Sequence, residues 1–189
     1  MAERVLYLVR HGQADGHDDD SSLTDRGREQ AASVVARMSD SGVLVVHHSP
    51  LPRAAETARI IADGLGAATV ADEIVGDYIP FDPLDGPDLP DRYAQFAAGL
   101  TASERDLGPH LAERAFERFA TAPDAGPDDV VSELVVTHNF TIGGFVCHAL
   151  AAPMWRWMTL NQANCGITVI RYRSALPPAL DCFNDTGHL

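Results

Sequence analysis

An arginine and a histidine stand side by side at the end of an apolar run near the start of the chain. The run is VLYLV, and Arg10 and His11 follow it directly. Because a guanidinium and an imidazole cost free energy to desolvate, such a pair belongs where a strand ends and solvent or an anionic ligand can reach it. The pair therefore indicates a site that receives a negatively charged group.

Two other apolar runs end in residues of the same kinds. His47, His48 and Arg53 follow the run VLVV, and His138 follows the run ELVVT. The carboxyl ends of parallel strands lie at one edge of an open sheet, where ligands bind at the topological switch point. Three separate segments are therefore expected to direct polar side chains into one crevice.

The residue types favour a phosphoryl group over a simple carboxylate as the ligand of this crevice. Guanidinium groups bind phosphate oxygens in bidentate fashion, which a lysine ammonium cannot do. A helix is expected to follow each of these strand ends, and the free N–H groups of its first turn also attract anions. The chain contains eight histidines, so one of them at a strand end would mean little, and the argument depends on their grouping with arginine.

The elements that must position these residues follow from the spacing of the apolar side chains. Short apolar or β-branched runs predict strands at residues 4–9, 43–47, 68–70, 133–137 and 166–172. Helical spacing predicts helices within residues 23–38, 49–66, 109–120 and 140–152. This alternation predicts an α/β fold, a three-layer α/β/α sandwich with a mainly parallel sheet.

Local signals refine the ends of these elements. Thr24 or Asp25 is suited to cap the first helix, and Ser49 to cap the second, which Gly64 or Gly66 would close. The segment 76–92 contains five acids and four prolines and predicts a loop over one edge of the sheet.

Composition limits the classes of protein to consider. A length of 189 residues, with 46% hydrophobic and 22% charged residues, is typical of a globular chain and predicts a single domain over residues 1–189. The net charge of −13 argues against nucleic acid or an anionic membrane as a partner. No apolar stretch approaches the roughly 20 residues of a membrane span, so a cytoplasmic location is expected. Three cysteines, predicted to be buried thiols, form no CxxC pair: Cys147, Cys165 and Cys182.

Four stretches together resemble the histidine phosphatase superfamily, which is also called phosphoglycerate mutase-like. They are LVRHGQAD at 8–15, LTDRGREQA at 23–31, HSPLPRAAETA at 48–58 and VVTHNFTIGG at 135–144. Any one of them is a weak signal, but all four occur in the family's order and together span most of the chain. The resemblance implies the phosphoglycerate mutase-like fold.

The resemblance also implies roles for the residues at the strand ends. His11 would be the nucleophile that attacks phosphorus and forms a phosphohistidine. Arg10, Arg53 and His138 would surround the phosphoryl oxygens and neutralise charge in the transition state. Such a pocket relies on positioning and electrostatics and implies neither a metal nor another cofactor.

Two neighbouring residues would complete the phosphate site. Gly12 suits a backbone that turns closely beside a phosphate, and Asn139 is placed to offer its N–H to the oxyanion. Many family members continue after the RHG block as ETxWN, whereas this chain reads QADGHDDDSS. This departure removes the asparagine that reaches the phosphate in those members, and Gln13 is the residue that would partly replace it. The acids at 18–20 lack the spacing of a metal loop.

The proton donor departs from the family pattern. Family members usually place a glutamate in an LxExxxG segment, and the corresponding region here reads ADEIVGDYIPFDP. It resembles branches whose acid lies three residues before a proline, which selects Asp77. Glu73 is the second candidate and Asp82 the third.

These inferences predict a phosphomonoesterase that acts on a small phosphorylated metabolite or a phosphorylated side chain. A phosphoglycerate mutase-type phosphotransferase is less favoured, because mutases of the family carry longer insertions and the usual glutamate pattern. The irregular acid region motivates a third reading, a non-catalytic module that binds a phosphorylated ligand. The sequence leaves the oligomeric state open.

Overall fold

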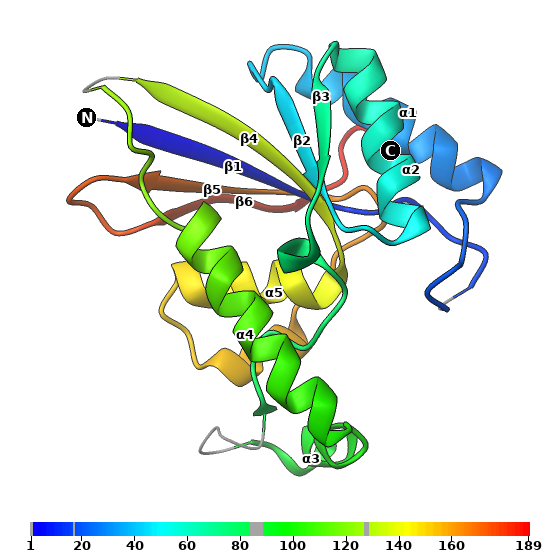
Figure 1. The fold of residues 1–189 in the computed structure, drawn as a ribbon, viewed down its shortest axis with the longest axis vertical. Helices are drawn as coiled ribbons and strands as arrows, with labels where there is room; N and C mark the ends of the chain where they lie inside the picture. The colour runs from blue at the N-terminus through cyan, green and yellow to red at the C-terminus, as the bar shows by residue number, and fades with distance from the viewer. Residues whose placement is uncertain (1, 17, 84–88, 127–128) are drawn as a thin grey trace.

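A computed structural model describes residues 2–16, 18–83, 89–126 and 129–189 (Figure 1). The strands are β1 (Glu3–Arg10), β2 (Val45–His48), β3 (Ala68–Ala71), β4 (Val130–Thr137), β5 (Ile167–Arg173) and β6 (Ala179–Asp185). The helices are α1 (Asp25–Met38), α2 (Pro52–Leu65), α3 (Asp91–Ala98), α4 (Ala102–Phe119) and α5 (Asn139–Ala149), with short 3-10 turns η1 (Glu73–Val75) and η3 (Met154–Thr159).

The strands form one six-stranded sheet in the order β3-β2-β4-β1-β5-β6. The pairs β3–β2, β2–β4 and β4–β1 are parallel. Strand β5 is antiparallel to both of its neighbours, β1 and β6. The predicted α/β fold with a mainly parallel sheet is therefore confirmed. The five predicted strands are all present, and β6 adds an edge strand that the sequence did not indicate.

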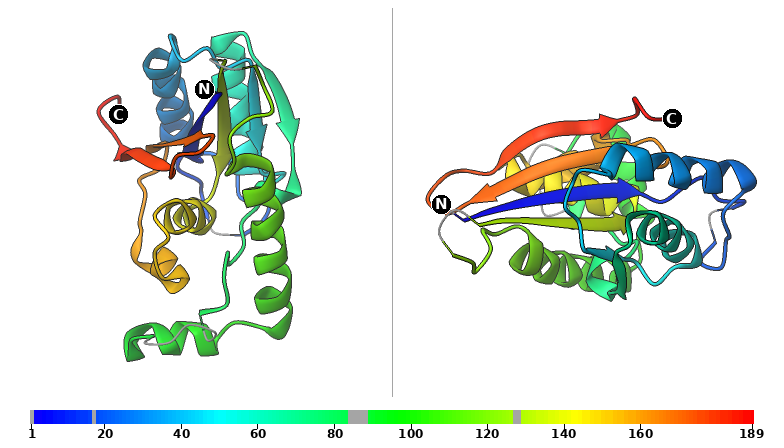
Figure 2. Two further views of the ribbon diagram at one scale, coloured as in Figure 1. Left: turned by 90° about the vertical axis from the view of Figure 1, so that its left-hand side faces the viewer. Right: turned by 90° about the horizontal axis from the view of Figure 1, so that it is seen from above.

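Helices cover both faces of the sheet, as the edge-on view in Figure 2 shows. Successive residues of a strand point to opposite faces, so β1 contributes to two cores. Leu8 packs with Phe119 of α4 and Phe145 of α5, while Val9 packs with residues of α1 and α2 such as Val34 and Ile61. Helix α3 lies at the far end of α4, away from the sheet (Figure 1).

One of the predicted helix caps is wrong. Thr24 caps α1, because its side chain accepts a hydrogen bond from the N–H of Gly27. Gly66 closes α2 in the left-handed conformation with φ of 68°. The prediction that Ser49 caps α2 is wrong: the N-cap is Leu51, and Pro52 occupies the first turn.

The segment between β3 and α4 departs further from prediction. Helix α4 begins at Ala102 with a capping box between Thr101 and Glu104, and so starts well before residue 109. In the predicted loop 76–92, residues 76–82 are irregular chain, as expected. Residues 84–88 of that loop lie outside the described part, and α3 begins at Asp91.

The thiols lie in different environments. Cys147 and Cys165 are buried, and Cys182 is half-buried, so the prediction that all three are buried is wrong for Cys182. The reason is its place on the edge strand β6, which has a neighbour on one side only. Within the described ranges, no helix has the length and apolar character needed to cross a bilayer.

The sheet order locates the place where a ligand would bind. The chain leaves β1 toward β2 on one side of the sheet and leaves β4 through α5 toward β5 on the other side. The adjacent ends of β1 and β4, where Arg10 is in register with Thr137, are therefore a topological switch point.

Candidate active site

A crevice of about 270 Å³ opens at the carboxyl ends of β1 and β4. Two hydrogen bonds hold the surrounding chain segments together: the N–H of His11 donates to the carbonyl of Thr137, and the N–H of Ser49 donates to that of Val136. The crevice is lined by Arg10, His11, Gly16, Arg53, Asp77, His138, Asn139, Phe140 and Asn161.

Two imidazoles face each other in this crevice. The ring centroids of His11 and His138 are 5.0 Å apart and their planes are tilted by 55°. Nδ1 of His11 lies 2.8 Å from the carbonyl oxygen of Gly12, and a carbonyl only accepts, so Nδ1 carries the proton. In the neutral ring, Nε2 of His11 therefore keeps its lone pair. Nε2 of His138 lies 2.8 Å from Oγ of Ser49.

Both rings are held in the neutral form. Burial is the main cause that lowers the pKa of His11 to about 3, and the neighbouring His138, Arg10 and Arg53 contribute to the same shift. Burial also lowers the pKa of His138 to about 3, with added repulsion from Arg53 and Arg10. At neutral pH the crevice thus offers an unprotonated imidazole nitrogen beside two guanidinium groups.

The two guanidiniums are oriented mainly by backbone carbonyls. Arg10 donates from Nη1 to the carbonyl of Gln162 at 2.5 Å. Arg53, only 3% exposed, donates from Nη1 to the carbonyl of Asp18 at 2.9 Å. Because a guanidinium has five N–H donors, these contacts leave donors for an anion. Nε of Arg10 is buried without a hydrogen-bond partner among the described residues.

One carboxylate links the second guanidinium to the second imidazole. Oδ2 of Asp77 lies 2.9 Å from Nη2 of Arg53 and 3.4 Å from Nδ1 of His138. Its side chain is 37% exposed, so it stands at the mouth of the crevice. Of the three candidate acids Asp77 lines the crevice, whereas Glu73 is exposed on η1 and Asp82 pairs with Arg105 at 3.7 Å.

The two remaining predicted residues have clear structural contacts. The N–H of Gly12 donates to Oγ1 of Thr57 at 3.0 Å. A Cβ on Gly12 would lie 2.5 Å from the carbonyl oxygen of Gly27, so the close approach of α1 requires glycine there. Asn139 is the first residue of α5, and its side chain accepts from the N–H of Gln162 and donates to the carbonyl of Leu160.

The two histidines of β2 do not line the crevice. His47 lies 3.5 Å from the carboxylate of Glu133, and Nδ1 of His48 bonds to the carbonyl of Ser49. The expectation that they point into the crevice is wrong, because both are residues of the strand itself and do not belong to the loop that follows it. Arg53, from the first turn of α2, is the residue of this segment that reaches the crevice.

Sequence reasoning missed several residues that hold the reactive groups in place. Ser49, which the sequence predicts as a helix cap, contacts His138. The loop before β5 supports the first strand: Nδ2 of Asn164 donates to the carbonyl of His11 at 2.9 Å, and the N–H of Cys165 donates to the carbonyl of Arg10. Asn161 of the same loop lines the crevice. The only sequence signal for them was two asparagines just before the last predicted strand.

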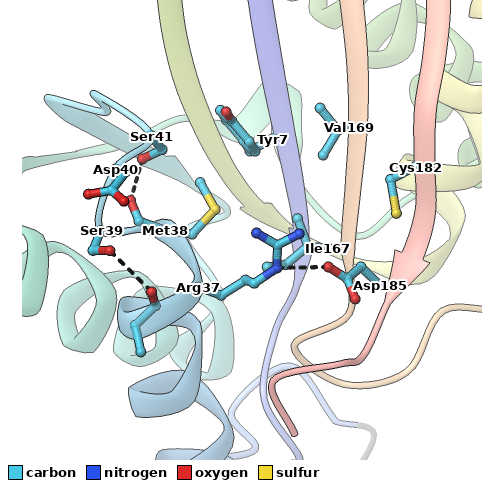
Figure 3. Close-up of a pocket in the computed structure, with 11 residues that line it drawn as sticks. Tyr7, Arg37, Met38, Ser39, Asp40, Ser41, Ile167, Val169, Cys182 and Asp185 are labelled. Atoms are coloured by element: carbon cyan, nitrogen blue, oxygen red, sulfur yellow. Dashed lines mark hydrogen bonds and ion pairs between the residues drawn. The ribbon is translucent and has the colours of Figure 1, made fainter.

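A separate hollow of about 390 Å³ lies between the end of α1 and strands β5 and β6 (Figure 3). Arg37 and Asp185 form an ion pair across it at 2.9 Å, and Tyr7 and Cys182 line it. It contains none of the residues of the crevice, and the ion pair satisfies its cation. In the described part of the chain, no group of three or more His, Cys, Asp or Glu side chains is arranged to hold a metal ion.

Fold, residue order and crevice geometry agree with one protein family. The family model of the histidine phosphatase superfamily (branch 1) matches residues 6–186. The chain therefore belongs to the histidine phosphatase superfamily.

Two relatives of this chain carry names of different activities. The mitochondrial serine/threonine-protein phosphatase Pgam5 of Caenorhabditis briggsae is 30% identical over 201 residues; the match covers all of this chain and 65% of Pgam5. The chain thus spans about two thirds of the length of that relative. A probable phosphoglycerate mutase, GpmB of Erwinia tasmaniensis, is 30% identical over 186 residues, which cover 90% of this chain and 86% of GpmB.

Solved structures share the fold. Mycobacterial glucosyl-3-phosphoglycerate phosphatase with inorganic phosphate superimposes with a TM-score of 0.73 at 21% identity, covering 98% of this chain and 99% of that one. A phosphoserine phosphatase of Entamoeba histolytica superimposes with a TM-score of 0.67 at 22% identity, covering 98% and 99%. At these identities the likeness establishes the fold.

Proposed function

We propose that the chain is a phosphomonoesterase that works through a phosphohistidine on His11. The observation that carries the proposal is the neutral ring of His11, whose Nδ1 bonds to a carbonyl and whose Nε2 keeps its lone pair. In the first step Nε2 attacks phosphorus and the bond from phosphorus to the ester oxygen breaks, while Asp77, which takes up a proton from solvent as the substrate displaces it from Arg53, gives that proton to the leaving oxygen. In the second step water attacks the phosphohistidine and gives a proton to Asp77, which releases phosphate and regenerates His11.

The neighbouring residues stabilise the charge that develops on the phosphoryl group. Arg10 and Arg53 are assigned to bind its oxygens, because both guanidiniums line the crevice and retain unused donors. His138 lies 5.0 Å from His11 between centroids and is assigned to the same oxygens. A phosphate that takes over Nη2 of Arg53 also releases Asp77 from its ion pair, which frees that carboxyl for proton transfer.

Gly12 and Asn139 are assigned supporting parts. The N–H of Asn139 belongs to the first turn of α5, where helix N–H groups have no partner within the helix, and is offered to the oxyanion. Gly12 allows the chain after β1 to pass closely beside the phosphate site. The proposed substrate is a small phosphorylated metabolite or a phosphorylated side chain, and a single domain over residues 1–189 and a cytoplasmic location are part of the same proposal.

A trapping experiment tests the covalent step. Purified protein mixed with an aryl phosphate and quenched within the first turnovers should carry phosphate that is labile to acid and stable to alkali, on the peptide that contains His11. The His11→Ala variant should carry none and should not hydrolyse the ester. Turnover without any trapped phosphohistidine, or with the label on another residue, would contradict the proposal.

The relation to GpmB supports one alternative, a phosphoglycerate mutase-type phosphotransferase. Such an enzyme would interconvert phosphoglycerates in the presence of the bisphosphate and would release little inorganic phosphate. The same assay decides a third possibility, a module that only binds phosphorylated ligands, because a pure binder forms no covalent adduct.

A further inference from the structure

A second hollow, of about 440 Å³, adjoins the crevice. Asp77 and Phe140 belong to the linings of both, so the two spaces meet at the proposed proton donor. Four parts of the chain complete the second lining. They are the loop between β1 and α1 with Asp19, the chain after η1 with Tyr78 and Ile79, the segment of α3 and the chain after it, and the N-terminal part of α4.

The position of Asp77 indicates which part of a substrate this hollow would receive. The proton donor must contact the ester oxygen, which joins phosphorus to the leaving group. With phosphorus beside His11 in the crevice, a leaving group bonded to that oxygen extends past Asp77. The hollow on the far side of Asp77 is the space open to it.

The walls of this hollow are largely apolar. Helix α4 contributes leucines and lies so close to the chain after η1 that a Cβ on Gly108 would sit 2.2 Å from the carbonyl oxygen of Ile79. Two large side chains of the lining remain exposed in the free protein, Phe96 at 42% and Leu107 at 57%. Contact with an apolar group would remove this surface from water, which is favourable.

The charges on the lining are negative. Glu104 accepts hydrogen bonds from the N–H and hydroxyl of Thr101, and these bonds lower its pKa, so it stays ionised. Asp19 is the second acid besides Asp77. No arginine occurs among the described lining residues, and the chain contains no lysine. The sequence of residues 84–88, LDGPD, contains no basic residue. An anionic leaving group would therefore meet repulsion from Glu104 and Asp19, because Arg53, the cation that pairs with Asp77, is assigned to the phosphoryl group.

We propose that this hollow is a leaving-group pocket for uncharged apolar alcohols or phenols and that it discriminates against leaving groups with a carboxylate. The inference rests on the proposed phosphomonoesterase activity and specifies its substrate class. It sets the chain apart from enzymes that act on phosphoglycerates, whose leaving group carries a carboxylate.

A neighbouring hollow of about 260 Å³ provides the main competing route. It is lined by Arg92, Tyr93, Phe96, Phe140, Trp157 and Met158, and Asp77 is not part of its lining. Its arginine would favour a carboxylated leaving group. Because the proton donor belongs to the other hollow, the apolar route is the one that allows protonation of the ester oxygen.

The test compares kcat/KM for two alkyl esters of similar leaving-group basicity, 3-phenylpropyl phosphate and 3-carboxypropyl phosphate. We expect the phenylpropyl ester to be preferred at least tenfold. Leu107→Arg places a cation at an exposed position of the lining and should reduce this preference about tenfold, mainly by improving the carboxylated ester. Leu44→Arg, at a position 76% exposed before β2, is the matched control and should leave the ratio unchanged.

Different results would contradict the leaving-group pocket and the proposed phosphomonoesterase activity. Equal kcat/KM values for both esters, or a ratio that Leu107→Arg and Leu44→Arg change alike, would overturn the pocket assignment while the phosphohistidine stands. A preference for the carboxylated ester that Arg92→Gln abolishes would move the leaving group to the neighbouring hollow and overturn it too. Hydrolysis of neither ester, with no trapped phosphohistidine from an aryl phosphate, would refute the activity itself.

Discussion

Two clusters of arginine, histidine and acid side chains lie along the same central strands and are organised in opposite ways. In the first, three groups surround the carboxylate of Glu133 on β4. Nε of Arg4 lies 3.0 Å from Oε2 of Glu133. On the other oxygen, Oε1, Nη2 of Arg118 lies at 2.8 Å and Nε2 of His47 at 3.5 Å. Burial alone would raise the pKa of Glu133, but the hydrogen bonds from His47 and Arg118 and the charge of Arg4 lower it to about 2.

The second cluster is the crevice, where the cations are not saturated by acids. Arg10 and Arg53 are held by backbone carbonyls, and the partly exposed Asp77 is the carboxylate that pairs with Arg53. The imidazoles, of His11 and His138, stay neutral. The difference shows that one set of residue types builds either a closed structural ion pair or an open anion site, depending on whether a buried carboxylate stands at its centre.

The largest expected effect separates the histidines of the two clusters. His11→Asn should lower kcat on an aryl phosphate by at least about 10⁴-fold, because the variant lacks the nucleophile. His47→Gln removes an imidazole from the closed cluster and should keep kcat within about threefold. Steady-state kinetics on both purified variants is the measurement. Similar losses of kcat in the two variants would show that the clusters do not differ in their role in catalysis.

The next effect concerns stability. Glu133→Ala leaves Arg4 buried without its carboxylate, so the free energy of unfolding should fall by about 3–5 kcal/mol. Asp77→Ala, at a side chain 37% exposed, is the matched change in the crevice and should cost less than about 1 kcal/mol. Urea unfolding followed by circular dichroism measures both. If Glu133→Ala were as stable as the parent, the closed cluster would not be structural.

The alternation of apolar runs was enough to predict the central part of the fold. β1, β2, β4 and β5 are buried runs between polar segments, and their pattern is local. β6 lacks such a signal, because Asp181 and Asn184 interrupt its apolar residues and it depends on pairing with β5. α3 was missed because its eight residues directly follow a proline-rich stretch that reads as loop.

The site was predictable to the extent that strand ends determine it. Arg10 is the last residue of β1, and His11 and His138 are the first residues after β1 and β4. All three line the crevice. The part played by Ser49 was not predictable, because a serine before a helix is equally suited to capping and to a distant hydrogen bond. The loop before β5 supports β1 through contacts more than 150 residues apart in sequence, such as that of Asn164 with His11, which no local pattern encodes.

The choice among the three acids depended on irregular chain and leads to the third prediction. Asp77→Asn should lower kcat about 10²- to 10³-fold for an alkyl phosphate, whose leaving oxygen needs a proton, and less than about tenfold for 4-nitrophenyl phosphate. Glu73→Gln, on the exposed side of η1, is the control and should change neither rate. A larger loss in Glu73→Gln, or equal losses of Asp77→Asn on the two esters, would assign the proton to another group.

The smallest effect is a difference in acid sensitivity between the clusters. A histidine with a pKa of about 3 in the folded state and near 6.5 in the unfolded state binds its proton only on unfolding within that interval. Unfolding is therefore favoured as pH falls from 6.5 toward 3, and each such ring contributes a slope of about 1.4 kcal/mol per pH unit. Glu133, with its pKa lowered to about 2, costs stability only below pH 4.5.

The crevice should therefore control stability between pH 6 and 5, before the closed cluster begins to respond. Urea unfolding at these two pH values measures the free energy of unfolding. Between pH 6 and 5 this free energy should fall by about 1 kcal/mol less in His11→Asn than in the parent. Glu133→Gln should keep the parental slope here and differ from it only below pH 4.5. Equal slopes in the parent and His11→Asn would mean that the ring of His11 is already protonated in the folded protein, and a protonated ring could not attack phosphorus.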